Sequence, residues 1–337
     1  MSARVAAIGV CHWHSLYDSA YLRLLAGMDD VEIVGLQDDD PAIARHRAME
    51  LGGNVPTFTD YRQMLIEVRP DFVLALGRHD TMGETARYLL DSRVPFIMEK
   101  PMSFNARQLR GVVEAAEATN GFAAVPLGNR YQPIIQQARQ LIHDGTYGPM
   151  THFYSRMNRP TSQRYPAWGA GWMLDPRSAN GGCLRNLGSH GLDAFVYLSG
   201  EGEDIEVTGA QLSWSTHGQP VEDYASILVK SGSGVLGTIE IGNAFPRDGT
   251  DGEWKVGFRD AVLTLKDGVL KLNTPEGEEV LPSEPPGNLS ALALREAMDA
   301  AGRGDKPPIS VRDCYRAVRL IDMAYIAAGN PYGTAEV

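Results

Sequence analysis

The sequence predicts an α/β protein with two domains. We expect residues 1–124 to form a doubly wound parallel sheet, and residues 125–337 to form an α+β domain with a large, mostly antiparallel open sheet. Two observations predict this class. In the first third of the chain, short apolar segments alternate with helical patterns, which is typical of βαβ units. After about Gly148, strand candidates separated by turn residues follow one another instead, and this succession indicates antiparallel pairing.

The first domain contains five short strand candidates, with helical stretches between them. They cover residues 5–9, 31–36, 71–76, 94–98 and 122–125. A helical pattern after the first of them runs through Leu25. Pro41 suits the first turn of a helix that ends at Gly52, and Asp60 can cap a helix that runs to about Val68. Ligands of such sheets bind beyond the carboxyl ends of the strands, so the residues that follow each strand are the first candidates for a site.

The second domain is expected to begin with a strand, an irregular loop and a helix. The strand covers 150–156, the aromatic-rich loop 158–180 and the helix 187–198. Further strand candidates cover 205–214, 224–230, 234–242, 254–258, 261–266 and 268–272. Two amphipathic helices, at about 289–301 and 311–328, complete the pattern.

Composition narrows the class of partner. The chain has 337 residues, of which 43% are hydrophobic, and a formal net charge of −11, which argues against nucleic acid or an anionic membrane as a partner. No segment reaches the roughly 18 apolar residues of a membrane span, and no secretory signal pattern is visible. Cys11, Cys183 and Cys314 are widely separated, as is typical of reduced thiols, so we expect a cytoplasmic protein.

The loop after the first strand is a candidate phosphate loop. A dinucleotide-binding loop carries three glycines in the pattern G-x-G-x-x-G, and here only Gly9 remains, because Cys11 and His14 occupy the other two places. Cys11 weakens a close phosphate approach without excluding it. The loop by itself is equally compatible with an ordinary turn between a strand and a helix. Metal binding by Cys11, His12 and His14 is disfavoured, because such close ligands seldom converge on one ion.

Asp38 strengthens the nucleotide hypothesis. It ends the second strand candidate, where a carboxylate can accept hydrogen bonds from ribose hydroxyls. It would also repel a 2′-phosphate, so the sequence favours NAD over NADP. Asp39 and Asp40 are also compatible with a solvated acidic loop or a helix cap.

Glu99 and Lys100 directly follow the fourth strand candidate, at the ligand edge of the predicted sheet. Pro101 restricts the backbone of Lys100 to an extended form, which can direct the side chain into a cleft. A lysine there can donate a hydrogen bond to a substrate oxygen and stabilise an alkoxide. Without that context, an exposed Glu-Lys pair would be the simpler interpretation.

A polar stripe lies on the helix predicted after Gly181-Gly182. If the helix begins near Asn186, then Asn186, His190 and Asp193 fall at i, i+4 and i+7, on one face of an otherwise apolar helix. Such a stripe is costly to bury without partners, so it indicates a site rather than core packing.

These motifs together resemble the glucose–fructose oxidoreductase, inositol dehydrogenase and MocA (Gfo/Idh/MocA) family of NAD(P)-dependent oxidoreductases. The resemblance extends over most of the chain, and its pieces are weak singly but specific in their order and spacing. They are Gly9, Asp38-x-Asp40-Pro41, Thr59-Asp60-Tyr61, Glu99-Lys100-Pro101, Asn129-Arg130-Tyr131-x-Pro133, Gly145-x-x-Gly148, and Gly181-Gly182 leading to His190-x-x-Asp193.

The resemblance implies an N-terminal Rossmann domain and a second α/β domain whose open sheet often serves in oligomerisation, here as a homodimer or homotetramer. It also implies hydride transfer between nicotinamide and a sugar, cyclitol or related polyol. Lys100 and His190 match the family's acid/base residues. Asn186 stands where the family has an aspartate, and Asp193 matches a substrate ligand or an orienting group for His190.

The expected site residues fall into three groups. The catalytic group is Lys100, His190 and Asn186. The group expected to bind NAD is Gly9, Cys11, His12, Trp13, His14, Asp38, Gly77, Arg78, His79, Glu99 and Lys100. The group expected to bind substrate is Asp193, Arg130, Tyr131, Trp168 and Trp172. No metal is expected. In the predicted reaction His190 takes the hydroxyl proton and Lys100 stabilises the alkoxide. Because the amide of Asn186 cannot accept a proton as the family's aspartate can, Lys100 is expected to carry more of the proton transfer.

The loop at 158–180 is a candidate substrate cover. Its aromatic residues suit the C–H faces of a sugar, and Arg164 and Arg177 can pair with a carboxylate such as that of a uronate; packing is an equally good explanation of its tryptophans. Around the expected cofactor, Gly77-Arg78-His79 replaces the family's Thr-Pro-Asn, and Met82 replaces a histidine. These departures keep two alternatives open: an enzyme that uses bound NAD without net redox change, and a non-catalytic sugar- or NAD-binding protein on the same fold.

Overall fold

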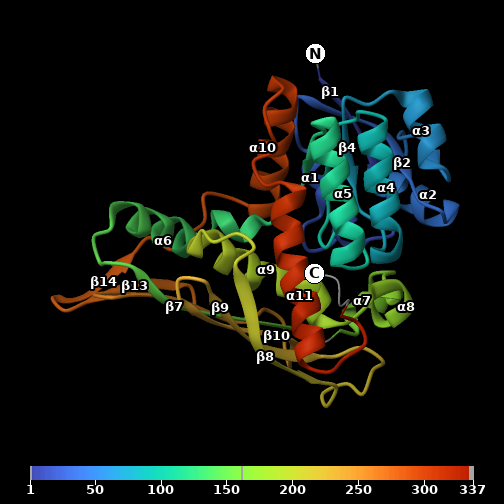
Figure 1. Ribbon diagram of the computed structural model, residues 1–337. Helices are drawn as coiled ribbons and strands as arrows, with labels where there is room; N and C mark the ends of the chain where they lie inside the picture. The colour runs from blue at the N-terminus through green and yellow to red at the C-terminus, as the bar shows by residue number, and fades with distance from the viewer. Residues whose placement is uncertain (1, 161, 334–337) are drawn as a thin grey trace.

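A computed structural model describes residues 2–160 and 162–333 of the chain. Its two sheets confirm the fold class that the sequence predicts. One sheet has six parallel strands, and the other has eight strands that are mostly antiparallel (Figure 1).

The six-stranded sheet has the order β3-β2-β1-β4-β5-β6, and all its paired strands are parallel. Its strands are β1 (Ala3–Ile8), β2 (Val31–Gln37), β3 (Thr57–Phe58), β4 (Phe72–Ala75), β5 (Phe96–Met98) and β6 (Ala123–Ala124). Its helices are α1 (Tyr21–Ala26), α2 (Pro41–Glu50), α3 (Tyr61–Val68), α4 (His79–Asp91) and α5 (Ala106–Thr119). The strand order reverses between β1 and β4, so the loops after these two strands lie at the topological switch point where such sheets bind ligands.

Local sequence signals explain most of these boundaries. Asp60 caps α3 through the N–H of Arg62, as expected, and Asp40 caps α2 by accepting a hydrogen bond from the N–H of Ala42, one of the two interpretations left open for it. The helix predicted to run through Leu25 after β1 is wrong in extent. The chain forms a 3₁₀ turn, η1 (Trp13–Ser15), and α1 begins only at Tyr21. Asp18 and Ala20 have φ of 53° and 49°, and this left-handed backbone interrupts a continuous helix.

The eight-stranded sheet has the order β14-β13-β12-β11-β7-β10-β9-β8, in which only β7 and β10 pair in parallel. Its strands are β7 (Met150–Pro160), β8 (Ile205–Ser213), β9 (Tyr224–Ser231), β10 (Leu236–Phe245), β11 (Asp251–Phe258), β12 (Val262–Lys266), β13 (Val269–Thr274) and β14 (Gly277–Leu281). The last strand, β14, and the short β3 are absent from the sequence-based expectation. β7 also continues four residues further than expected.

Short helical elements replace much of the loop predicted between 158 and 180. The elements before and after β7 are η2 (Gly128–Tyr131), α6 (Pro133–Asp144), α7 (Arg164–Ala167), η3 (Gly171–Leu174), α8 (Pro176–Ala179) and α9 (Cys183–Ser199). Helix α9 begins at Cys183, four residues before its expected start at Leu187. Helices α9, α6 and α11 (Val311–Ala327) cover one face of the eight-stranded sheet, and the other face is open (Figure 1).

The chain returns to the first domain after the second sheet. Helix α10 (Leu289–Arg303) places Leu294 and Ala297 in the same hydrophobic core as Val5 and Ala7 of β1. A helix distant in sequence thus packs in the same core as the parallel sheet. Helix α11 packs on both domains, with Val318 in one core and Ile321 in the other.

Within the described ranges, the structure contains no helix with the length and apolar character needed to cross a membrane.

Candidate active site

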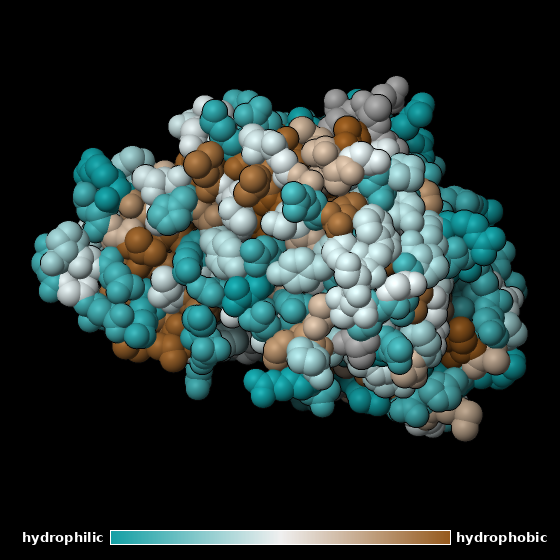
Figure 2. All heavy atoms as spheres, turned by 90° about the horizontal axis from the view of Figure 1, so that it is seen from below, coloured by the Kyte–Doolittle hydropathy of each residue, from teal (hydrophilic) through white to brown (hydrophobic). Residues whose placement is uncertain are grey.

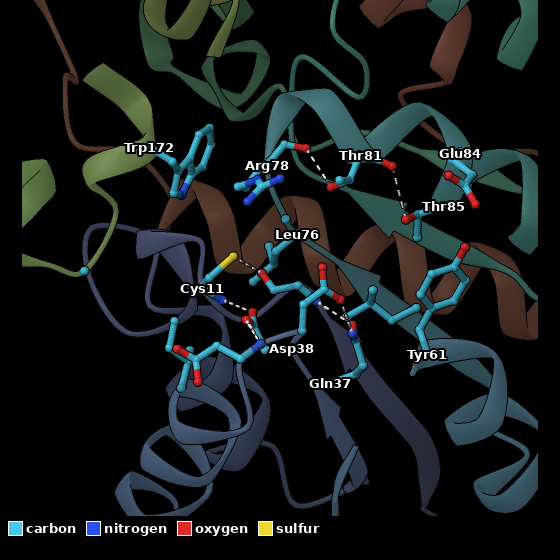
Figure 3. Close-up of a pocket in the computed structure, with 17 residues that line it drawn as sticks. Cys11, Gln37, Asp38, Tyr61, Leu76, Arg78, Thr81, Glu84, Thr85 and Trp172 are labelled. Carbon is cyan, nitrogen blue, oxygen red and sulfur yellow. Dashed lines mark hydrogen bonds between the residues drawn. The ribbon is translucent and has the colours of Figure 1, made fainter. Parts of the chain in front are cut away.

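A cavity of about 460 Å³ lies beyond the carboxyl ends of β1, β2 and β4. Figure 3 shows Cys11 and Trp172 at one end of this cavity and Tyr61 and Glu84 at the other. Five of the residues expected to bind NAD line it, namely Gly9, Cys11, Asp38, Gly77 and Arg78. We call it the cofactor cavity.

Gly9 is required by the close approach of two loops. It has φ of 66°, and a Cβ atom added there would lie 2.5 Å from the Cα atom of Gly77, nearer than real contacts allow. Gly77 itself has φ of 95°. The glycine therefore lets the chain turn after β1 while the loop after β4 packs against it, so its function at this position is partly structural.

The N–H groups of this loop are directed to acceptors within the protein. Those of Gly9 and Val10 donate to the carbonyl oxygen of Gln37, at 2.9 and 3.2 Å. The N–H of Cys11 donates to Oδ2 of Asp38 at 2.6 Å, and the N–H of Asp40 donates to Oδ1 of the same carboxylate at 3.2 Å (Figure 3). Asp38 thus closes the loop, and burial raises the pKa of its carboxyl group above the usual value.

The cavity nevertheless offers the groups that a dinucleotide needs. Asp38 retains lone pairs for ribose hydroxyls, because a carboxylate accepts up to about four hydrogen bonds. Arg78 supplies a positive charge, and the indole Nε1 of Trp172, which has no hydrogen-bond partner among the described residues, supplies a donor. Burial raises the pKa of the Cys11 thiol, so this side chain is uncharged at neutral pH and does not repel a phosphate. The residues present therefore fit NAD.

A second cavity, of about 280 Å³, contains the three residues expected to be catalytic, Lys100, Asn186 and His190. We call it the substrate cavity. Trp13 and His14 line it as well, so the single loop that follows β1 contributes to both cavities.

Lys100 is buried and held by one neighbour. Its Nζ donates to the backbone oxygen of Asn186 at 2.7 Å and to Oδ1 of the same residue at 2.6 Å. Nδ2 of Asn186 donates in turn to the hydroxyl oxygen of Tyr165 at 2.8 Å, which fixes the orientation of the amide. Burial lowers the pKa of Lys100 below the usual value for a lysine, and the charge of Glu99 opposes this effect only in part.

His190 is a neutral imidazole at neutral pH. Burial, followed by the positive charge of Lys100, lowers its pKa to about 3. Its Nδ1 has no hydrogen-bond partner within the described part of the chain. His190 lines the substrate cavity, but so low a pKa makes this imidazole a weak base.

Glu99 lies behind the cavity in a charged network. Its Oε1 lies 2.9 Å from Nδ1 of His14 and accepts a hydrogen bond from the Tyr21 hydroxyl at 2.9 Å. Burial alone would raise the pKa of Glu99, yet its interactions with His14 and Lys100 hold it below its usual range. An ionised carboxylate only accepts hydrogen bonds, so Nδ1 of His14 carries the proton in this pair.

Several residues expected to bind NAD lie in an aromatic block between the two domains. The ring of His12 stacks on that of Trp13 at 3.9 Å, Trp13 packs edge-on against Tyr165 at 5.1 Å, and His79 packs against Trp172 at 5.1 Å. Nδ1 of His79 lies 2.8 Å from the carbonyl oxygen of Ala179. His12 and His79 are fully buried here, so the structure places them in packing that joins the domains rather than along the cofactor cavity.

The residues expected to bind substrate lie elsewhere. Asp193 accepts two hydrogen bonds from Arg130, at 2.9 and 2.6 Å, because the helical stripe turns toward η2 one turn beyond His190. The Tyr131 hydroxyl donates to Glu296, and the Trp168 ring stacks on Tyr17 at 5.3 Å. Trp172 lines the cofactor cavity. None of these five is among the described residues that line the substrate cavity.

The substrate cavity has lining residues that sequence reasoning missed. Asp18, Asn129 and Arg159 all face it, and so does Arg164, whereas Arg177 is exposed and pairs with Asp175. Arg159 was missed because the strand was expected to end at residue 156. In the structure β7 continues to Pro160, and this extension brings Arg159 to the cavity. Asn129 belongs to the motif Asn129-Arg130-Tyr131 and Arg164 to the expected substrate cover, so these two had a sequence signal and Asp18 and Arg159 had none.

Comparisons with known proteins identify the family. Residues 3–126 match the family described as "Oxidoreductase family, NAD-binding Rossmann fold", and residues 135–257 match the "GFO/IDH/MocA C-terminal domain". The D-glucoside 3-dehydrogenase of Escherichia coli K12 is 26% identical over 71% of this chain and 67% of its own length. The putative oxidoreductase YteT of Bacillus subtilis is 32% identical, but over 36% of this chain and 29% of its own length.

A solved structure shows the same fold along nearly the whole chain. An oxidoreductase from Agrobacterium radiobacter, in complex with NAD⁺, L-tartaric acid and magnesium, superposes with a TM-score of 0.84. Its sequence is 17% identical, and the superposition covers 98% of this chain and 97% of that one.

Proposed function

Because this chain belongs to the Gfo/Idh/MocA family of oxidoreductases, with an NAD-binding Rossmann domain, we propose that it transfers a hydride between NAD and a secondary hydroxyl of a sugar, cyclitol or related polyol. One observation carries this proposal: Lys100, Asn186 and His190 line a single cavity, next to a second cavity that fits a dinucleotide. The name of the Escherichia coli relative, a dehydrogenase of glucosides, supports the class of substrate.

The residues that would hold NAD are those of the cofactor cavity, with Asp38 toward the ribose hydroxyls and Arg78 and Trp172 toward the phosphates. When bound, NAD supplies the acceptor for the hydride. Asp38, Asp39 and Asp40 line the same cavity, and their carboxylates would repel the 2′-phosphate of NADP, so we propose NAD as the cofactor.

Lys100 handles the proton in the proposed reaction. Burial lowers the pKa of Lys100 and so makes its neutral amine easier to reach, and a neutral amine can take the hydroxyl proton of the substrate, whereas His190 is too weak a base to do so efficiently at neutral pH. Asn186 is a positioning residue, because its two oxygens fix Nζ of Lys100. His190, which lines the same cavity, orients the substrate hydroxyl through a hydrogen bond.

The test is to titrate the protein with NADH by fluorescence and then to follow a panel of polyols at the absorbance of NADH. The Lys100→Met variant should lose about 10²- to 10⁴-fold in kcat, the usual contribution of a positioned acid or base. It should still bind NADH. A matched control is Lys306→Met, an exposed lysine between α10 and α11, which should leave turnover unchanged.

Each outcome of this test has a definite meaning. Full activity in Lys100→Met would remove the proposed role of that residue. NADH binding with no net reduction of NAD by any polyol would favour an enzyme that uses NAD without net redox change. Failure to bind NADH would favour a cofactor-free binding protein on this fold.

We also propose that the protein acts in the cytoplasm as a homodimer or homotetramer. Cys11, Cys183 and Cys314 are all free thiols, which is typical of a reducing compartment. The open face of the eight-stranded sheet carries the exposed apolar side chains of Leu228 and Leu236. Figure 2 views the molecule from this side and shows hydrophobic residues interspersed with polar ones.

A further inference from the structure

The substrate cavity contains an imidazole that has no role in the proposed reaction. His14 lines this cavity together with Lys100 and Asp18. Its Nδ1 lies 2.9 Å from Oε1 of Glu99, and its Nε2, at the opposite edge of the ring, lies 4.0 Å from Oδ2 of Asp18. Because His14 stands at the place of the third glycine of a dinucleotide-binding loop, its side chain is a feature that the usual loop lacks.

Glu99 fixes the orientation and the tautomer of the His14 ring. Its carboxylate also accepts a hydrogen bond from the Tyr21 hydroxyl at 2.9 Å and one from the backbone N–H of Lys100 at 3.1 Å, so three groups hold it in place. An ionised carboxylate only accepts hydrogen bonds, so Nδ1 of His14 carries a proton. In the neutral ring Nε2 is then the nitrogen that can accept a proton, and it lies on the side of Asp18.

The proposed reaction leaves a proton on a buried group. Oxidation of a hydroxyl to a carbonyl releases one proton for each hydride transferred, and this proton passes to the amine of Lys100. Lys100 is 2% exposed, and its amine must lose the proton before it can act again. The side chains of His14 and Asp18, in the same cavity, are 12% and 27% exposed. They therefore offer proton-accepting groups between the buried amine and solvent.

Two other imidazoles suit this step less well. Burial and the charge of Lys100 lower the pKa of His190 to about 3, so this ring does not hold a proton at neutral pH. Burial also lowers the pKa of His12 well below its usual value, and Nδ1 of His12 already accepts a hydrogen bond from the N–H of His14 at 3.1 Å. Of the three, His14 is the one with a carboxylate partner within the described ranges.

We propose that His14 takes the proton from Lys100 after hydride transfer and passes it to solvent on the side of Asp18. This inference rests on the proposed function and adds a proton exit to it. In each turnover the O–H bond of the substrate breaks and an N–H bond forms at Nζ of Lys100. The proton then moves to Nε2 of His14, and the imidazolium releases it to solvent while Glu99 offsets its charge. Both residues are neutral again at the end of the cycle.

The test is the time course of NADH formation after rapid mixing of the protein with NAD and a polyol that it oxidises. The pH is set where the native rate is highest, so that Lys100 begins as the neutral amine. In His14→Asn the amide nitrogen takes the place of Nδ1 and keeps a donor for Glu99, but nothing takes the place of Nε2. The first turnover should therefore keep its native rate. Later turnovers should be about 10²-fold slower, the lower end of the usual contribution of a positioned acid or base.

Further variants separate proton transfer from damage to the fold. Lys100→Met should lose the first turnover as well as the later ones. In His14→Gly, imidazole added to the buffer should raise the steady-state rate in proportion to its concentration. His143→Asn, at an exposed position on α6 outside both cavities, should keep the native time course. If His14→Asn fails to fold, His14→Gln gives the same comparison, because its amide can donate to Glu99 and cannot carry the proton.

The inference and the proposed function can fail separately. A native time course in His14→Asn would overturn the proton exit and leave the dehydrogenase assignment intact. A slow first turnover in this variant would overturn it as well, since His14 would then act before hydride transfer is complete, and so would a rate in His14→Gly that imidazole does not raise. A native protein that oxidises no polyol would contradict the proposed function, and the inference would fall with it.

Discussion

Asn186 contacts the amine of Lys100 through two uncharged oxygens, and burial lowers the pKa of this amine. Replacing Asn186 by aspartate would place a carboxylate next to Nζ of Lys100, and its negative charge would favour the ammonium form of the lysine. The pKa of Lys100 should therefore rise, and less neutral amine should be present at pH 7.

The prediction is a shift in the pH dependence of oxidation. In the native protein kcat/KM should increase with pH through an ionisation below the usual lysine value, since the neutral amine is the active form. In Asn186→Asp the same rise should occur about one pH unit or more higher, the size of shift that a close opposite charge causes. The NADH dissociation constant serves as the control. An unshifted profile would show that Lys100 is not the titrating group.

Gly9 provides a test of structure at the same scale. Gly9→Ala combines the cost of a left-handed backbone, about 1–2 kcal/mol, with a collision against Gly77. Gly145 has the same φ of 66° and nothing within 4 Å of an added Cβ, so Gly145→Ala carries the backbone cost alone. In urea unfolding, Gly9→Ala should lose clearly more stability than Gly145→Ala. Equal losses would mean that the two loops relax without cost.

At the scale of elements, the sequence predicts regular segments better than it predicts their joins. The alternation of strands and helices in residues 1–124 identifies every strand of the parallel sheet except the two-residue β3. The pattern fails at the first loop, where apolar spacing indicates a helix but the left-handed residues Asp18 and Ala20 and the buried Trp13 produce a 3₁₀ turn and a short α1. Periodicity records which side chains are apolar, and it does not record which partner buries them.

The same limit explains what was missed in the site. Lys100 and His190 belong to recognisable motifs, so the sequence identifies them as candidates. The structure places both in one cavity. Arg159 and Asp18 carry no motif. They meet only because β7 extends beyond its apolar pattern and passes next to the loop after β1, a contact between residues 141 positions apart.

Helix α10 gives a prediction for an element that crosses between domains. Leu294 is fully buried in the core of the parallel sheet, so Leu294→Ala should reduce the free energy of unfolding by about 2–5 kcal/mol, the usual cost of such a cavity. Ile66 on α3 is 68% exposed, and Ile66→Ala should change the free energy of unfolding by less than about 0.5 kcal/mol. NADH binding should fall together with folding during urea denaturation of Leu294→Ala. A stability equal to that of the native chain would show that α10 is not part of this core.

At the scale of the whole molecule, the open face of the eight-stranded sheet has the mixed character of an interface. Its centre is polar, with Arg156 contacting Asp251 at 2.9 Å and the Tyr154 hydroxyl donating to Glu240 at 2.9 Å. Leu228 is 48% exposed and Leu236 is 57% exposed, and they lie on the neighbouring strands β9 and β10. Exposed apolar side chains on neighbouring strands of an uncovered sheet face are typical of surfaces that pair with another chain, and we propose that a second copy of this chain covers them.

Oligomerisation through this face would be disrupted by a buried charge. In a symmetric pair each substitution is present twice, so Leu228→Asp would place two unpaired carboxylates in the interface and weaken it strongly. Light scattering during gel filtration should then give the mass of one chain for Leu228→Asp and a dimer or tetramer for the native protein. Ile66→Asp, on the distant helix α3, adds the same charge to an exposed apolar position and should leave the mass of the native assembly unchanged. If Leu228→Asp remains fully assembled, the subunits associate through another surface. The open face of the eight-stranded sheet is then exposed to solvent in the assembly.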